Sequence, residues 1–154
     1  MSDSFFPRGG VWVLWQAILM TTVIVLAFCF RGSIPLPLAR PVGIILLAIA
    51  AFLGLAGFLA LRGNLTPFPK PRHGANLVQS GVYSLVRHPL YTAVILGALG
   101  WALAARSWPA ALAAGALSAF FNVKAGIEER WLAQKFPEYK TYATRVKRFI
   151  PFLW

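Results

Sequence analysis

The chain is 154 residues long, 58% of its residues are hydrophobic and only 12% are charged, and its mean hydropathy is +0.67. Because soluble domains carry about 25% charged residues, this composition excludes an ordinary soluble domain. It predicts one all-α integral membrane domain that takes up residues 1–154. A formal net charge of +11 would suggest nucleic-acid binding in a soluble protein. Here the basic residues flank apolar runs, so lipid head groups and topology account for them, and we expect no nucleic-acid partner.

Two apolar runs occupy the first part of the chain. Val11–Phe30 would be about 30 Å long as a helix, which is enough to cross the hydrocarbon core. A secretory signal peptide is the competing interpretation, but the run is long for one and no small-x-small cleavage site follows it, so we expect a retained helix. A turn with two prolines leads into the second run, Pro41–Leu61. Small residues that would let a neighbouring helix approach share one face of this run: Ala50, Gly54 and Gly57.

The second half of the chain begins with a long polar connection, Arg62–His88, of a length that usually indicates function. Two further apolar runs follow, Leu90–Ala105 and Trp108–Val123, and a helical pattern continues past the last run to Lys135. In the tail, Phe136–Phe149, aromatic residues recur at helical spacing with basic residues between them, which predicts an amphipathic helix on the membrane surface. The predicted fold therefore has four transmembrane helices and an amphipathic C-terminal interfacial helix.

The basic residues predict the orientation of these helices. Three of the fifteen lie in the two short connections: Arg31, Arg40 and Arg106. The other twelve lie in the N-terminal segment, in the connection 62–88 and from Lys124 onward, and they include Arg8, Arg62 and Arg72. The positive-inside rule therefore predicts that both termini and the long connection face the cytoplasm.

A cationic pair precedes the third run. Pro89 suits the first position of a helix and disfavours helical geometry at His88, so this helix should begin at Pro89, with Arg87 and His88 just outside it. A helix N-terminus next to these side chains suits a carboxylate or a phosphate. Tyr83 and Tyr91 add hydroxyl groups nearby. The alternative is that all these side chains only anchor the helix end among lipid head groups.

Acidic residues follow the fourth run. Lys124 and Glu128 are four residues apart and share a helical face, whereas Glu129 points elsewhere. Carboxylates close to a bilayer are costly unless they are paired or functional. One interpretation is an ordinary ion pair on a solvated helix face. The other is a cytoplasm-facing anion site with nearby carboxylates, because this cluster and the cationic pair lie on the same predicted side of the membrane.

Several kinds of site are absent from the sequence. No Gly-x-Gly-x-x-Gly follows a strand, and no Walker loop occurs. The only histidines are His73 and His88, and Cys29 is the only cysteine, so we expect no metal and no intramolecular disulfide. Asp3 is the only aspartate, which argues against a Ser/His/Asp triad. The residues alone do not name a reaction.

Five motifs in the second half of the chain occur in a fixed order: Leu65-Thr66-Pro67-Phe68-Pro69, Gly81-Val82-Tyr83, Arg87-His88-Pro89-Leu90-Tyr91, Glu128-Glu129, and Phe136-Pro137-Glu138-Tyr139 through Arg148-Phe149-Ile150-Pro151. From about Gly63 onward the chain resembles the isoprenylcysteine carboxyl methyltransferase family and its phospholipid-methyltransferase-like prokaryotic relatives. This resemblance implies an S-adenosylmethionine pocket within residues 81–154, with a lipid-side entrance for a hydrophobic or lipidic substrate. We therefore expect a bacterial inner-membrane enzyme whose cofactor site is cytoplasmic.

The resemblance assigns roles by position. The residues implied in cofactor binding are Arg87, His88, Pro89, Tyr91, Tyr83 and Glu128, and those implied in catalysis are Glu128, Lys124 and Glu129. Lys124 stands where the isoprenylcysteine enzymes have an arginine, and lysine lacks the bidentate fork that arginine presents to a carboxylate. The implied reaction is direct methyl transfer from the sulfonium. A carboxylate acceptor needs no base, whereas an amine could lose its proton to Glu128 or Glu129.

The acceptor and the functional class stay open at this point. An isoprenoid carboxylate, a lipid amine (as for a phospholipid N-methyltransferase) and a thiol are all compatible with the sequence. A small four-helix transporter is the first alternative to an enzyme, but the four predicted spans contain no acidic residue. A non-catalytic membrane subunit is the second. The sequence does not indicate an oligomeric state.

Overall fold

The computed structural model describes residues 9–61, 63, 65–70, 74 and 76–151. Five residues considered above lie outside these ranges: Asp3, Arg8, Arg62, Arg72 and His73. Within the described residues the regular structure is helical. The helices are α1 (Gly10–Cys29), α2 (Ala39–Leu61), the 3-10 helix η2 (Gly81–Ser84), α3 (Pro89–Ala104), α4 (Trp108–Lys135) and α5 (Tyr139–Arg145).

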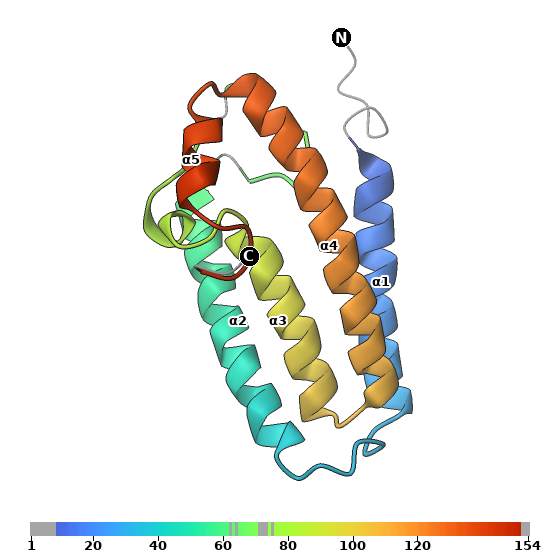
Figure 1. Cartoon of the computed structure of the whole chain (residues 1–154). Helices are drawn as coiled ribbons and strands as arrows, with labels where there is room; N and C mark the ends of the chain where they lie inside the picture. Colours follow the sequence, from blue (N-terminus) through green and yellow to red (C-terminus); the bar gives the residue numbers. More distant parts are fainter. Residues whose placement is uncertain (1–8, 62, 64, 71–73, 75, 152–154) are drawn as a thin grey trace.

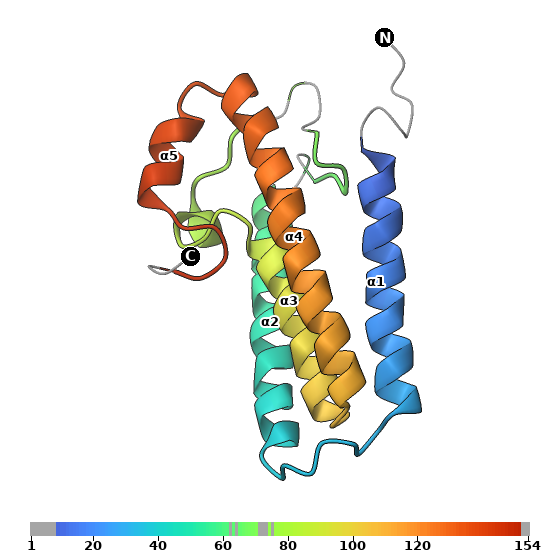
Figure 2. The same cartoon turned by 45° about the vertical axis from the view of Figure 1, so that its right-hand side comes forward.

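The four long helices run side by side as a bundle (Figure 1). α2 packs most extensively on α3, α3 also contacts α4, and α1 packs chiefly on α4. The short connections 30–38 and 105–107 lie at one end of the bundle, and η2, α5 and the C-terminal tail lie at the other (Figures 1 and 2). The buried core contains Val23 of α1 together with Leu117 and Phe121 of α4.

Among the described residues, three helices are long and apolar enough to cross a membrane, namely α1, α2 and α4. Their surfaces support this role, because large apolar side chains face outward; Phe52 of α2, for example, is 67% exposed. α3 is apolar but has only 16 residues. The fourth crossing expected from the sequence therefore stays a prediction.

The helix boundaries have local causes. α3 begins at Pro89, as predicted, because proline has no N–H to lose at a first helical position. α4 begins after Ser107, whose hydroxyl accepts a hydrogen bond from the Ala110 N–H. α4 then continues to Lys135, which confirms the predicted extension beyond the apolar run.

The tail differs from the sequence prediction. Only the seven residues of α5 are helical, and the chain then extends back along the start of α3. The N–H of Arg87 donates to Lys147 O at 2.8 Å, and the N–H of His88 donates to Arg148 O at 3.1 Å. The prediction of a helix through Phe149 is therefore wrong for its last residues, because their backbone groups are engaged by another segment. Whether α5 lies on the membrane surface stays a prediction.

The contact between α2 and α3 depends on small residues. Ala50 and Gly57, part of the predicted small-residue face, are buried against α3. The closest approach is at Gly43, where an added Cβ would lie 2.6 Å from the backbone oxygen of Gly100. Gly54 has more room, since a Cβ added there would lie 3.6 Å from the Ala93 Cβ.

We therefore expect Gly43→Ala to separate α2 from α3 and to destabilise the protein by about 1–3 kcal/mol, because backbone atoms cannot give way as a side chain can. Gly54→Ala is the matched control and should leave the thermal midpoint unchanged or slightly raised, because alanine favours helix more than glycine does. Thermal unfolding in detergent measures both variants. Equal midpoints for the two would contradict the close approach at Gly43.

Candidate functional site

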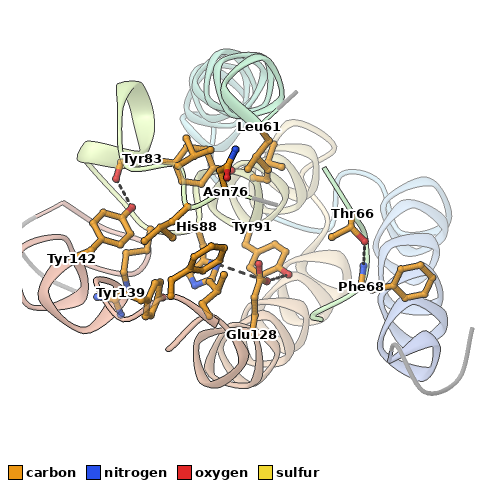
Figure 3. Close-up of a pocket in the computed structure, with 16 residues that line it drawn as sticks. Leu61, Thr66, Phe68, Asn76, Tyr83, His88, Tyr91, Glu128, Tyr139 and Tyr142 are labelled. Carbon is orange, nitrogen blue, oxygen red and sulfur yellow. Dashed lines mark hydrogen bonds and ion pairs between the residues drawn. The ribbon is translucent and has the colours of Figure 1, made fainter. Parts of the chain in front are cut away.

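An open cavity with a volume of about 110 Å³ lies at the end of the bundle where η2, α3, α4 and α5 meet. This volume is below the range of small-molecule sites, about 300–1,000 Å³. Figure 3 shows the side chains of His88, Tyr91, Glu128 and Tyr139 close together, with Thr66 and Phe68 lying apart from this group. Six of the lining side chains are aromatic, namely Phe68, Tyr83, Tyr91, Phe136, Tyr139 and Tyr142, and three are ionisable, namely Arg87, His88 and Glu128.

Glu129 does not line the cavity, and its carboxylate contacts three basic side chains. Its Oε1 accepts hydrogen bonds from Arg87 Nη2 at 2.8 Å and from Arg148 Nε at 3.1 Å. The same oxygen lies 3.1 Å from His88 Nε2, and its Oε2 accepts from Arg148 Nη2 at 2.5 Å. The carboxylate thus joins α4 to the start of α3 and to the tail. A carboxylate whose oxygens already accept this many hydrogen bonds is chiefly structural.

The two arginines have further partners. Arg87 Nη1 donates to the carbonyl oxygens of Ala143 and Val146, at 2.9 and 2.5 Å, and so closes the C-terminal end of α5. Arg148 Nη1 donates to Asn122 Oδ1 at 2.7 Å. Its hydrogen bonds to Glu129 raise the pKa of Arg148 further above its already high value. Both guanidinium groups therefore hold the tail against the bundle.

Glu128 faces the cavity. Its Oε2 accepts a hydrogen bond of 2.5 Å from the Tyr91 hydroxyl and lies 4.0 Å from His88 Nδ1. The rings of His88 and Tyr91 are stacked, with centroids 5.2 Å apart. Glu128 is partly exposed, and its Oε1 has no hydrogen-bond partner among the described residues. This carboxylate oxygen is the one anionic group of the cavity wall that the described contacts leave available to a ligand.

Three tyrosines form the wall opposite Glu128. The Tyr142 hydroxyl donates to Tyr83 O, and burial raises the pKa of Tyr142 to about 12, so it stays a neutral donor at physiological pH. Burial also raises the pKa values of Tyr83 and Tyr139. Within the described part of the chain, the Tyr139 hydroxyl is buried and has no hydrogen-bond partner. An unpaired buried hydroxyl is costly, and a ligand atom in the cavity could satisfy it.

Lys124 is 1% exposed and lies beside the cavity rather than on its wall. Its ammonium group donates to Gln16 Oε1 at 2.5 Å and to Pro67 O at 3.0 Å. The same nitrogen lies 5.3 Å from the centre of the Tyr91 ring. Lys124 thus connects α4 to α1 and to the segment 65–70, and it does not sit on a solvated helix face.

Comparison with known protein families identifies the family of this chain. The sequence model of the family described as phospholipid methyltransferase matches residues 38–139, which is well over half of the 154 residues. The matched range contains α2, α3, α4, the Arg87–Tyr91 motif and both central glutamates. The chain belongs to the phospholipid methyltransferase family. The resemblance noted in the sequence is thereby confirmed. The match to a methyltransferase family, together with three described helices that are long and apolar enough to cross a membrane, indicates an integral membrane protein.

Two curated relatives carry names from metal resistance. The chain is 31% identical over 152 residues to the cobalt-zinc-cadmium resistance protein CzcN of Cupriavidus metallidurans, across 97% of this chain and 67% of that protein. It is 35% identical over 81 residues to the nickel-cobalt-cadmium resistance protein NccN of Alcaligenes xylosoxydans xylosoxydans, across 52% of this chain and 38% of that protein. Among the described residues, no group of three or more His, Cys, Asp or Glu side chains could hold a metal ion.

For this family member, the structure brings most of the predicted site residues together. Tyr83, Arg87, His88, Tyr91 and Glu128 all line the cavity. Pro89 is buried at the start of α3, Glu129 lies behind the wall, and Lys124 lies beside it.

Several residues in the site were not predicted as site residues, among them Arg148 and Tyr139. Arg148 and Tyr139 both belong to the family-like ending of the sequence, so that motif was the available signal. Their contacts depend on the fold of the tail, which the spacing did not reveal.

Proposed function

We propose that this protein is an S-adenosylmethionine-dependent membrane methyltransferase that acts on a hydrophobic or lipidic acceptor at the end of the bundle formed by η2, α3, α4 and α5. The observation that carries the proposal is the Glu128 carboxylate in an aromatic-lined cavity beside the N-terminus of α3, in a chain of a methyltransferase family. The cytoplasmic position of this end, predicted from the basic residues, is part of the same proposal.

The described residues fit the cofactor chemically. Aromatic faces such as those of Tyr83 and Tyr91 suit an adenine ring and a sulfonium cation. The N-terminus of α3, next to His88, suits the methionyl carboxylate. The unpaired Tyr139 hydroxyl supplies a hydrogen-bond donor. When bound, S-adenosylmethionine supplies an electrophilic methyl group on its sulfonium.

The roles of the two glutamates can now be separated. Glu129 is occupied by Arg87, Arg148 and His88, so it is a positioning residue. Glu128 keeps one carboxylate oxygen that accepts no hydrogen bond from the described residues, and it is the group that would accept a proton from the acceptor. The remaining work of the protein is to orient the acceptor and to keep water out.

A lipid amine is the acceptor class that this site supports best. Arg87, the one arginine on the cavity wall among the residues that the structure describes, is committed to Glu129 and to two carbonyl groups. Lys124 does not line the cavity. Among the described residues, a carboxylate acceptor would therefore meet the Glu128 charge without an uncommitted arginine or lysine on the cavity wall, whereas a protonated amine would be attracted to it.

The test uses the purified protein, labelled S-adenosylmethionine and a total lipid extract, followed by identification of the labelled product. Calorimetry on the same preparation should detect binding of S-adenosylmethionine. Both binding and labelling should fall in His88→Ala, and labelling should fall in Glu128→Ala. Lys140→Ala, at an exposed position of α5, is the control and should behave as the wild type. Unchanged binding and labelling in both site variants would overturn the site assignment.

A role in metal resistance is a second candidate, supported by the names of CzcN and NccN. Cells that lack the protein should then be more sensitive to cobalt, zinc or cadmium, and the wild-type protein should restore tolerance. If methyl transfer serves resistance, Glu128→Gln will fail to restore it. If Glu128→Gln restores tolerance fully, a non-catalytic membrane role is favoured instead. Cation-driven uptake in proteoliposomes would revive the transporter alternative.

The Tyr139 hydroxyl offers a separate prediction. Tyr139→Phe should weaken S-adenosylmethionine binding about 3- to 10-fold, because it removes one hydrogen-bond donor worth roughly 1 kcal/mol. The thermal midpoint should not fall, since no described residue pairs with this hydroxyl. Tyr142→Phe provides the contrast: it loses the bond to Tyr83 O and should lower the midpoint. Calorimetry and thermal unfolding check both variants, and wild-type affinity in Tyr139→Phe would contradict the assignment.

A further inference from the structure

An open pocket is lined by three arginines. It lies by the connections 30–38 and 105–107, at the end of the bundle opposite the candidate site (Figure 1). Arg31 follows α1, Arg40 lies in the first turn of α2, and Arg106 lies between α3 and α4. Three separate parts of the chain thus bring guanidinium groups to one pocket. In the sequence these are the three basic residues of the short connections, and the methyltransferase assignment gives them no role.

No acidic side chain balances this charge among the described residues. The acidic residues of the chain are Asp3, Glu128, Glu129 and Glu138. Asp3 lies outside the described residues, and the three glutamates lie at the opposite end of α4 or at the start of α5. The N-termini of α2 and α4 and the C-termini of α1 and α3 meet at this end, so their partial charges largely offset one another, and neither α2 nor α4 has an acid in its first turn. Arg40 in the first turn of α2 is unfavourable for that helix unless an anion lies nearby.

The frame of the pocket is fixed by hydrogen bonds. The N–H of Gly32 donates to Ala105 O at 3.1 Å, and the N–H of Ile34 donates to Arg106 O at 2.8 Å. Arg106 Nε in turn donates to Ile34 O at 2.9 Å, and the backbone of Arg106 has a φ of 55°, a value uncommon for a residue with a side chain. The Arg31 guanidinium lies 4.5 Å from the centre of the Phe28 ring. Two of the three cations are therefore positioned before any ligand arrives.

We propose that the Arg31–Arg40–Arg106 pocket binds a phosphate group. Arginine presents a planar fork of donors that matches phosphate oxygens, and several such groups around one cavity give a specific site. Ile44 and Trp101 also line the pocket and provide apolar surface beside the cations. Basic pockets between membrane helices bind lipid head groups by this combination. The phosphate could belong to an anionic lipid or to a soluble anion, and both sources use the same chemistry.

The test compares the two sources on the purified full-length protein in neutral detergent. Native mass spectrometry measures binding of dioleoylphosphatidylglycerol, with dioleoylphosphatidylcholine as the zwitterionic reference. Thermal unfolding with inorganic phosphate, against chloride at equal ionic strength, measures the soluble source. The variant is Arg31→Gln/Arg40→Gln, which leaves Arg106 and its bond to Ile34 in place. The matched control, Lys140→Gln/Arg145→Gln, removes the same charge from exposed positions of α5.

We expect the pocket variant to bind phosphatidylglycerol about tenfold more weakly or worse, because each lost contact to a charged phosphate is worth at least roughly a factor of ten. The control should stay within about twofold of the wild type. If inorganic phosphate instead stabilises the wild type and not the pocket variant, the site is confirmed and its ligand is soluble. Equal losses in the pocket variant and the control would overturn the proposal, since net charge alone would then account for binding. Unchanged lipid and phosphate binding in the pocket variant would overturn it as well.

Discussion

Glu128→Gln is expected to reduce methyl transfer to an amine acceptor by about 100-fold or more, the usual loss when a general base is removed. The glutamine can still accept the hydrogen bond from Tyr91, so the cavity wall should stay in place. What disappears is the negative charge and the ability to take a proton. The measurement is the initial rate of label transfer at saturating S-adenosylmethionine, together with the thermal midpoint.

Glu138→Gln is the matched control, because Glu138 is an exposed glutamate at the start of α5 and does not line the cavity. It should leave the rate unchanged. The kinetic constant that Glu128→Gln changes also distinguishes two possible roles of Glu128. A loss confined to kcat indicates a base, whereas a loss confined to the KM for the cofactor indicates an anchor for its positive charge. A wild-type rate in Glu128→Gln would remove Glu128 from the proposed mechanism.

The sequence was informative where a local rule decides the structure. The start of α3 at Pro89 follows from the missing N–H of proline, and the helical extension to Lys135 follows from a pattern that did not stop at Val123. The small residues of α2 correctly indicated a close helix contact. The family resemblance placed the expected pocket within residues 81–154, where most of the cavity lining lies. The family match confirmed that resemblance.

The parts that could not be predicted depend on contacts between distant segments. Glu129 meets Arg87 across 42 positions and Arg148 across 19, so spacing on one helix could not reveal either partner. The tail was predicted as a lipid-facing helix because its aromatic residues have helical spacing. In the structure Tyr139, Tyr142 and Phe149 are buried, and the backbone of the last residues pairs with the start of α3. A pattern of this kind shows that a face is apolar, but not whether lipid or protein covers it.

The position of Lys124 illustrates the same limit. Its spacing from Glu128 predicted a shared helical face, and both side chains do approach Tyr91. The partners of the ammonium group, Gln16 and Pro67, lie 108 and 57 positions away. A residue that spacing presents as a member of an ion pair is instead a connection between α1, α4 and the segment 65–70.

Glu129→Gln is expected to release the tail from the bundle. The substitution removes the carboxylate charge of a partly buried cluster and leaves Arg87, Arg148 and His88 without their anionic partner. Such a change costs about 3–5 kcal/mol in a fully buried pair and less in this partly exposed one. The four long helices should remain folded, because their core of Val23, Leu117 and Phe121 does not involve Glu129. The loss should therefore be local and should appear first in α5 and the segment after it.

Limited trypsin digestion tests this expectation, because Lys140, Arg145 and Lys147 lie in the tail and are exposed. Cleavage there should be much faster in Glu129→Gln than in the wild type or in Glu138→Gln. A double-mutant cycle with Arg148→Gln should give a coupling energy of about 1 kcal/mol or more, as residues in one hydrogen-bonded network are not additive. Additive effects of the two substitutions, with wild-type cleavage rates, would show that this ion cluster does not hold the tail.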